Sequence, residues 1–177
     1  MAGRNDQYKS APKFAIEGGK SYRAKFETSL GNFEAELYSD TAPTTVNNFV
    51  FLAGEGFYDG VIFHRVIPGF MAQGGDPTGT GTGGPGYKFA DEDIPAHRNY
   101  EKGTLAMANS GRNTNGSQFF ICFEELTKRG MLPKSYNIFG KVTSGMDVVD
   151  SMAKVQMNPG DRPAQDITLT KVTIESE

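Results

Sequence analysis

Two consecutive runs of alternating apolar and polar residues constrain the fold of this chain more than any other feature of its sequence. Residues 22–28 (YRAKFET) and 33–37 (FEAEL) place an apolar side chain at every second position. Such alternation is typical of a β-strand with one buried and one exposed face, because successive side chains point to opposite faces of a sheet. Gly31-Asn32 lies between the two runs, and this pair predicts a β-hairpin turn. The sequence therefore predicts an antiparallel sheet from residue 22 onward.

Helical spacing occurs at two places, and short apolar runs occupy much of the remaining chain. Apolar residues of 42–53 fall on one helix face with Pro43 in the first turn, and 146–153 has the spacing of a second, short helix. Further strands are predicted at 61–66, 70–73, 104–108, 118–123, 138–142 and 167–174. The alternation breaks between Leu169 and Val172, which indicates a β-bulge. Seven or eight strands with two separated helices favour a mainly β fold, a largely antiparallel sheet closed into a barrel.

Length and composition are those of one globular domain. With 177 residues, of which 37% are hydrophobic and 22% charged, the chain can bury a core of its own. Residues 1–20 are polar and lack periodicity, so we expect a loosely ordered N-terminal arm followed by one domain over residues 21–177. A net charge of −3 without a basic tract argues against nucleic acid as a partner, and no apolar run suits a signal peptide or a membrane span. We expect a cytoplasmic, monomeric protein.

Sequence signals for metal, nucleotide and nucleophilic chemistry are missing or lie in the wrong context. Cys122 is the single cysteine and the chain has two histidines, so we expect no disulfide, no zinc site and no cofactor. Residues 79–84 (GTGTGG) fit a dinucleotide fingerprint, but Pro85-Gly86 follows and no helix begins there, which favours a plain loop. Neither Ser110 nor Ser117 lies in the strand-turn-helix motif of a serine hydrolase.

The stretch from Phe63 to Asp76 (FHRVIPGFMAQGGD) contains polar and apolar residues close together in sequence. It places the cation of Arg65 eight residues before the amide of Gln73. On composition alone, the simpler interpretation is an exposed arginine on a strand, with His64 beside it as a hydrogen-bonded structural residue.

Longer runs change that interpretation. FHRVIPGFMAQGGD at 63–76 and MANSGRNTNGSQFFI at 107–121 occur together with VNNFVFLAGEGFYDG at 46–60 and IFGKV at 138–142. On these runs, residues 22–175 resemble the cyclophilins, which are peptidyl-prolyl cis/trans isomerases. The resemblance implies a closed eight-stranded antiparallel β-barrel capped by two α-helices, with the active face on the outside of the barrel.

The resemblance also implies which residues form that face. It gives catalytic roles to Arg65, Gln73, Phe70 and Asn109, and substrate-binding roles to Met71, Gly81, Ala108, Ser110, Gln118 and Phe120. Between residues 120 and 139 the chain is about three residues longer than the common family pattern. Anchoring this segment on residues 138–142 puts Leu132 in a hydrophobic pocket, Tyr136 where the family usually has histidine, and Met131 where many members have tryptophan.

The implied reaction needs no metal, cofactor or nucleophile, because rotation about an Xaa-Pro bond breaks no covalent bond. A hydrogen-bond donor aimed at the proline nitrogen would stabilise the twisted state, and the resemblance gives this role to Arg65. The expected partners are proline-containing peptides and unfolded proteins, together with a cyclosporin-type inhibitor that Met131 would bind weakly. A peptide-binding holdase stays open as an alternative, since the same groove would hold exposed Xaa-Pro segments. A hydrolase is disfavoured because the nucleophile motif is missing.

Overall fold

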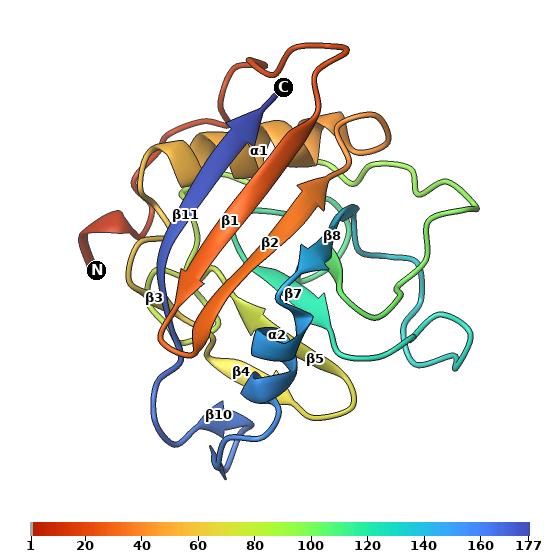
Figure 1. The fold of residues 1–177 in the computed structure, drawn as a ribbon. Helices are drawn as coiled ribbons and strands as arrows, with labels where there is room; N and C mark the ends of the chain where they lie inside the picture. The colour runs from red at the N-terminus through yellow and green to blue at the C-terminus, as the bar shows by residue number, and fades with distance from the viewer. Residues whose placement is uncertain (1) are drawn as a thin grey trace.

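A computed structural model describes residues 2–177, and Figure 1 shows how its elements are arranged. The helices are a 3₁₀ turn at Ala2–Arg4, α1 (Pro43–Gly54) and α2 (Met146–Met152). The strands are β1 (Tyr22–Thr28), β2 (Gly31–Leu37), β3 (Val61–Ile62), β4 (Arg65–Ile67), β5 (Met71–Gly74), β6 (Thr104–Met107), β7 (Phe119–Cys122), β8 (Ile138–Ser144), β9 (Met157–Asn158), β10 (Arg162–Pro163) and β11 (Thr168–Ser176). Within residues 2–177, no helix has the length and apolar character that a membrane crossing requires.

The elements with the clearest sequence patterns are confirmed. β1 and β2 form the predicted hairpin and pair in register from Tyr22 opposite Leu37 to Thr28 opposite Gly31. The predicted bulge lies in β11, because Glu27 pairs with Lys171 while its neighbour Thr28 pairs with Leu169, which leaves one extra residue in that strand. Both predicted helices form, and proline occupies the first turn of α1, where no backbone N–H donor is needed.

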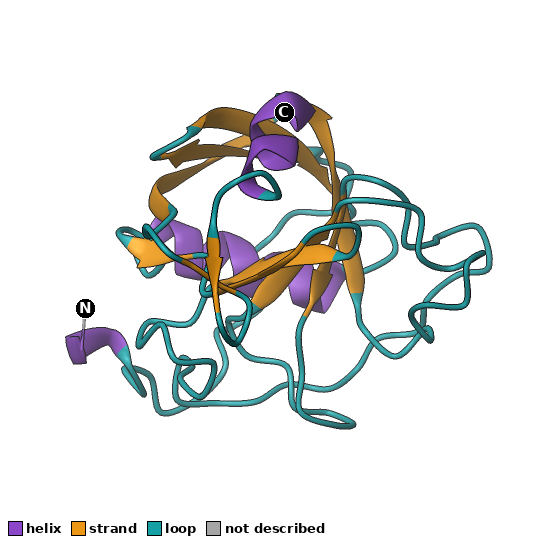
Figure 2. Cartoon of the chain, turned by 90° about the horizontal axis from the view of Figure 1, so that it is seen from below, coloured by secondary structure: helices purple, strands orange, loops and turns teal. Residues whose placement is uncertain are grey.

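The sheet is strongly curled, but a closed ring of eight strands is not confirmed. Nine strands form one sheet in the order β3-β11-β1-β2-β8-β6-β7-β5-β4, and every pair in it is antiparallel. The predicted strand at 61–66 is split in two, so that β3 pairs with β11 and β4 pairs with β5 at the two ends of this order. Residues 63–64 join these two edge strands through the chain itself, without a pairing between them in the described residues. Figure 2 shows the resulting half-barrel from below.

Aromatic side chains fill the inside of the curled sheet. The rings of Phe26 and Phe33 stack at 4.5 Å, and Phe49 from α1 contacts Phe119 of β7 edge-on with a centroid distance of 5.7 Å. On β7, Phe119 belongs to this inner core, whereas its neighbour Phe120 belongs to a second buried cluster on the outer side. Both faces of β7 are therefore covered, which explains why this strand is a continuous apolar run.

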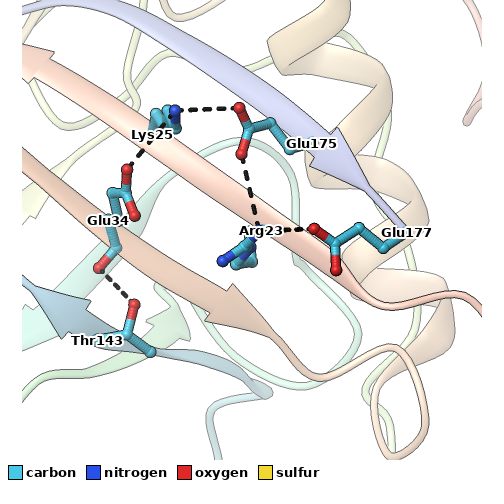
Figure 3. Close-up of polar contacts among 6 residues, drawn as sticks. All are labelled: Arg23, Lys25, Glu34, Thr143, Glu175 and Glu177. Carbon is cyan, nitrogen blue, oxygen red and sulfur yellow. Dashed lines mark hydrogen bonds and ion pairs between the residues drawn. The ribbon is translucent and has the colours of Figure 1, made fainter.

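The outer face of β1, β2 and β11 carries charges that neutralise one another (Figure 3). Lys25 Nζ lies 3.0 Å from a carboxylate oxygen of Glu175 and 3.7 Å from one of Glu34. Arg23 lies 3.1 Å from Glu177. These exposed pairs contribute little to stability. They leave this face without the excess of positive charge that binding to a phosphate backbone requires.

The arm before β1 lies against the domain. Asn47 of α1 accepts hydrogen bonds from the backbone N–H groups of Ala15 (2.8 Å) and Ile16 (3.2 Å), and its amide donates to the carbonyl of Lys13 (3.1 Å). How firmly residues 1–20 are held in solution stays a prediction, but the described part of the arm has defined partners.

Candidate active site

Three neighbouring strands place one row of side chains on the outer face of the sheet. Arg65 of β4 pairs with Gln73 of β5, which in turn pairs with Phe120 of β7. Paired residues of antiparallel strands lie side by side on the same face. Arg65 is exposed, Gln73 is half-buried and Phe120 is buried, so the row runs from a free cation to an apolar surface. A proline ring and the peptide bond before it could lie along such a row.

A chain of amide hydrogen bonds leads from this row to the glycine-rich loop. Gln73 Nε2 donates to Gln118 Oε1 at 2.9 Å. Gln118 Nε2 donates at 3.0 Å to the carbonyls of both Gly81 and Gly83. The predicted site residues Gln73, Gln118 and Gly81 are therefore brought together, although up to 45 residues separate them in sequence.

The apolar end of the row is a compact cluster. Met71 and Phe120 are buried in it, and the half-buried side chains Phe70, Ala108, Leu132 and Tyr136 pack against it. The rings of Phe120 and Tyr136 meet edge-on with a centroid distance of 5.7 Å. The half-buried side chains of this cluster offer an apolar surface against which a pyrrolidine ring could pack.

Two hydrogen bonds with Tyr100 fix the position of Tyr136, at the end of the segment that the resemblance aligned only through residues 138–142. The Tyr100 hydroxyl donates to the carbonyl of Tyr136 at 2.8 Å and accepts a hydrogen bond from its backbone N–H at 3.0 Å. Leu132 and Tyr136 therefore lie beside the other predicted residues. Met131 is 46% exposed at the edge of the cluster.

Asn109 and Ser110 lie in the turn after β6, beside the row. The Asn109 side chain donates to the carbonyl of Ser135 (3.0 Å) and accepts from the backbone N–H of Gly111 (3.2 Å). Ser110 N–H donates to Thr114 Oγ1 at 2.9 Å. Within residues 2–177, the backbone N–H and C=O of Asn109 have no partner, so both can pair with a bound peptide strand. The structure thus brings the predicted site residues other than Met131 together around this row, while their roles in catalysis stay predictions.

The buried carboxylate of Asp76 accepts hydrogen bonds from the glycine-rich loop at 79–84, the segment that fits the dinucleotide fingerprint. One oxygen of Asp76 accepts from the backbone N–H and hydroxyl of Thr78 (2.7 and 2.8 Å), and the other accepts from the N–H groups of Gly81 (2.6 Å) and Gly83 (3.1 Å). A Cβ at residue 83 would lie 2.2 Å from the carboxylate, which explains the glycine there. Burial alone would raise the pKa of Asp76, but these hydrogen bonds outweigh burial and hold the pKa below its usual value.

Replacing Asp76 with asparagine is expected to lower the free energy of unfolding by about 1–3 kcal/mol, because an amide NH₂ would face backbone N–H donors. Since the folded-state pKa is depressed, the wild-type carboxylate stabilises the fold above the unfolded-state value of 3.8, and this stability is lost as the pH falls through the lower folded-state pKa. Urea unfolding at several pH values measures both effects. Asp93→Asn, at an exposed position, is the matched control, and equal stabilities of the two variants would contradict this account.

His64, which the sequence analysis interpreted as a structural residue, lies next to the candidate site. It lies between β3 and β4, is 8% exposed, and lines a cavity of about 440 Å³ together with Arg65, Gln73 and Arg162. Its Nδ1 is buried and has no hydrogen-bond partner among the described residues, unlike the hydrogen-bonded structural histidine expected. Burial lowers the pKa of His64 and outweighs the opposing effect of the Asp76 charge, while Arg162 and Arg65 lower the pKa further, so the ring is neutral near pH 7. The one indication in the sequence was its position next to Arg65.

Isomerase activity is expected to stay constant between about pH 6.5 and 9 and to fall at lower pH, once His64 takes up a proton beside Arg65. Because the folded-state pKa is lowered, the unfolded chain binds this proton more readily, so stability also falls as the pH drops below 6.5. The measurement is kcat/KM against pH for the wild type and for His64→Gln, which should lack the acidic decline. An inflection centred above pH 6.5 would show that His64 is not held neutral.

The side chains that could serve as nucleophiles or metal ligands are buried, hydrogen-bonded to other groups or not clustered. Burial raises the pKa of the Cys122 thiol to about 12, which keeps it protonated and unreactive. The Ser117 hydroxyl is buried and donates to the carbonyl of Gly75 at 2.7 Å. Among residues 2–177, no three side chains of the metal-binding types gather into a cluster. The site offers a cation, amides and an apolar surface, which suits noncovalent binding and rotation of a peptide.

Comparisons with known proteins agree with this geometry. The family model for cyclophilin-type peptidyl-prolyl cis-trans isomerases matches residues 23–174. The chain is 50% identical over 152 residues to peptidyl-prolyl cis-trans isomerase CYP18-1 of Arabidopsis thaliana, covering 84% of this chain and 93% of that one. It is 48% identical over 155 residues to peptidyl-prolyl cis-trans isomerase-like 1 of Aspergillus fumigatus, covering 86% and 94% of the two chains.

Solved structures of cyclophilin-type isomerases have the same fold as this chain. The crystal structure of a cyclophilin-type isomerase from Cryptosporidium parvum superposes with a TM-score of 0.82 at 35% identity, over 89% of this chain and 99% of that one. A second structure of that protein, determined in the presence of the dipeptide Ala-Pro, gives a TM-score of 0.81 at 36% identity over 88% of this chain and 99% of that one. On its sequence, its fold and the arrangement of this site, the chain belongs to the cyclophilin-type peptidyl-prolyl cis-trans isomerases.

Proposed function

We propose that this isomerase accelerates rotation about Xaa-Pro bonds by a hydrogen bond from Arg65 to the proline nitrogen in the twisted state. The observation that carries the proposal is the row of Arg65, Gln73 and Phe120 on three paired strands. It sets a charged donor at one end of a surface that ends in an apolar cluster.

The chemistry favours this assignment. A planar Xaa-Pro amide resists rotation with a barrier of about 18–20 kcal/mol, because twisting removes the resonance of the C–N bond. The twisted nitrogen becomes pyramidal and gains a lone pair that can accept a hydrogen bond. A donor placed there binds the twisted state more tightly than either planar state, and such differential binding is catalysis. The guanidinium of Arg65 keeps its charge throughout the physiological pH range.

The neighbouring residues would restrain the substrate. Phe70, Met71, Phe120 and Leu132 would hold the proline ring, while the free backbone groups of Asn109 pair with the peptide. Gln73, in register with Arg65 and hydrogen-bonded to Gln118, would keep the guanidinium in place. An acceleration of 10⁵-fold corresponds to about 7 kcal/mol, which one charged donor, restraint of the ring and partial desolvation can supply together.

The direct test is turnover of a short labelled peptide with one Xaa-Pro bond. The expected result is faster exchange between the cis and trans forms without cleavage of the peptide. Cleavage, or exchange at the uncatalysed rate, would overturn the proposal.

A holdase remains the second candidate, because the same exposed row could bind Xaa-Pro segments of unfolded chains without turning them over. Suppression of aggregation separates the two roles. A holdase would keep this effect in Arg65→Ala, whereas assistance that depends on isomerisation would be lost with turnover. Action on unfolded client chains, a monomeric state and a cytoplasmic location stay predictions, of which gel filtration checks the second.

A further inference from the structure

We infer that residues 2–8 of the N-terminal arm are part of the peptide-binding site and set its preference for the charge of residues that flank the Xaa-Pro pair. The arm lies outside residues 23–174, which the family model matches, so this feature is an addition to the common domain. The inference rests on the proposed function and names a specificity determinant for it.

The arm pairs with the far end of the glycine-rich loop. Asp6 N–H donates to the carbonyl of Gly84 at 3.0 Å, and Tyr8 N–H donates to the carbonyl of Pro85 at 2.8 Å. Asn5 Oδ1 accepts from Gly84 N–H at 3.0 Å. Gly86 has a φ of +103°, and a Cβ there would lie 2.2 Å from the Tyr8 carbonyl, so the two segments approach too closely for any side chain. The backbones of residues 5–8 and 84–86 are therefore in direct contact.

Side chains on either side of this contact anchor the arm. The Tyr8 ring meets Phe51 edge-on with a centroid distance of 5.1 Å and lies 6.2 Å from Phe57. The Arg4 guanidinium donates to the carbonyls of Phe57 (3.2 Å) and Asp59. Between these anchors, Asp6 has a φ of +55°, which L-residues rarely adopt without support from their surroundings. The arm therefore holds Asp6 in a defined place.

That place is the wall of a cavity continuous with the candidate site. A cavity of about 780 Å³ is lined by Asp6 on one side and by Gln73, Gln118, Ala108, Asn109 and Ser110 on the other. Gln73 is the partner of Arg65 in the β4–β5 ladder, so a peptide seated at Arg65 and extended along Asn109 would send a flanking side chain into this cavity. The occupant is thus a residue of the substrate itself.

The charges lining the cavity predict which side chains it accepts. Among its described lining residues, Asp6 and Lys88 carry formal charge, and the signs are opposite. With both present, acidic and basic flanking residues are accepted to similar extents. Loss of the Asp6 carboxylate leaves Lys88, which favours acidic flanking residues, and loss of the Lys88 charge does the reverse.

The experiment compares peptides that carry Glu, Gln or Lys beside a constant Xaa-Pro pair, in one series before it and in another after it. Asp6→Asn is expected to shift the ratio of kcat/KM for the Glu peptide over the Lys peptide about two- to fivefold upward in at least one series, with the shift shrinking at high salt. Lys88→Gln should shift it downward. Tyr8→Ala, which removes the aromatic anchor, should act like Asp6→Asn, because the arm then no longer presents the carboxylate. Phe14→Ala, at a 63% exposed position of the same arm, is the matched control and should change nothing.

Dissociation constants of the same peptides give a second readout that does not need turnover. If the wild type binds but does not isomerise the peptides, the proposed function fails, while the binding ratios still decide the role of the arm. If the wild type isomerises them and Asp6→Asn leaves the Glu-to-Lys ratios of kcat/KM and of the dissociation constants equal to those of the wild type within experimental error, the arm has only a structural role and the inference is wrong.

Discussion

Replacing Arg65 with alanine is expected to lower kcat/KM for Xaa-Pro isomerisation by about 10- to 1000-fold, a loss of roughly 1.4–4 kcal/mol of transition-state stabilisation. The reason is that Arg65 is the charged member of the row it forms with Gln73 and Phe120, at the place where the proline nitrogen would lie. The measurement is exchange of a short labelled peptide by wild type and variant under the same conditions.

The fold should survive this change, because the Arg65 side chain is exposed and no hydrogen bond or ion pair within residues 2–177 depends on it. Arg65→Lys should also be poor, since an ammonium lacks the planar fork of a guanidinium. Arg23→Ala removes an exposed arginine from the ion pairs of Figure 3, and it should leave activity unchanged. Near-wild-type turnover in Arg65→Ala would remove the proposed mechanism.

Local sequence patterns predicted the parts of the fold whose contacts are close in sequence. Alternation around the turn at Gly31-Asn32 is a local signal, and the hairpin follows from it in register. The interrupted alternation in the last strand marked a bulge for the same reason. The break after Ile62 was not visible, because it depends on β3 and β4 pairing with strands at opposite ends of the sheet order. An apolar run can show that a segment is a strand, but it does not reveal that the strand changes partners.

In the candidate site, too, contacts between residues close in sequence could be predicted and contacts between distant residues could not. The motif at 63–76 carries Arg65 and Gln73 on adjacent strands, so their meeting follows from one short hairpin. The contacts of Asn5 and Asp6 with Gly84 span 79 and 78 residues and have no periodic signal, because a polar arm looks the same in sequence whether it is docked or free. The unpartnered Nδ1 of His64 was not predicted for a related reason. Burial lowers its pKa against the opposing charge of Asp76, and burial depends on contacts that the local sequence does not show.

The segment before β8 is held against the apolar cluster at its C-terminal end. Tyr100 binds both backbone groups of Tyr136, and this fixes the end of the segment next to Phe120. We therefore expect the additional residues that the resemblance implies to lie earlier, around Lys128, Arg129 and Gly130, which are exposed. Leu132 stays in the apolar cluster, while its neighbour Met131 projects at the rim.

Weak binding of cyclosporin is therefore expected, together with normal turnover of Xaa-Pro peptides. The resemblance puts Met131 where many cyclophilins have a tryptophan, whose indole N–H and ring would hold this cyclic peptide. Methionine donates no hydrogen bond, and its exposed, flexible thioether replaces a rigid surface. Losing one hydrogen bond and part of an aromatic contact should cost about 1–3 kcal/mol, or roughly five- to 150-fold in affinity relative to members with tryptophan.

Met131→Trp should recover part of that affinity, because residue 131 is 46% exposed and has room for the larger ring at the edge of the cluster. Turnover of short peptides should change little, since the proline ring would lie deeper, against Met71 and Phe120, which are only 3% and 5% exposed. Isothermal titration calorimetry of both forms with cyclosporin measures the difference, and Lys128→Trp, also in the exposed part of the segment, controls for a nonspecific gain from an added indole. Tight binding by the wild type, or equal gains from the two tryptophans, would mean that residue 131 does not occupy the position assigned to it. A gain confined to Met131→Trp would show that this one side chain separates inhibitor binding from catalysis, because the inhibitor reaches the rim and a short substrate does not.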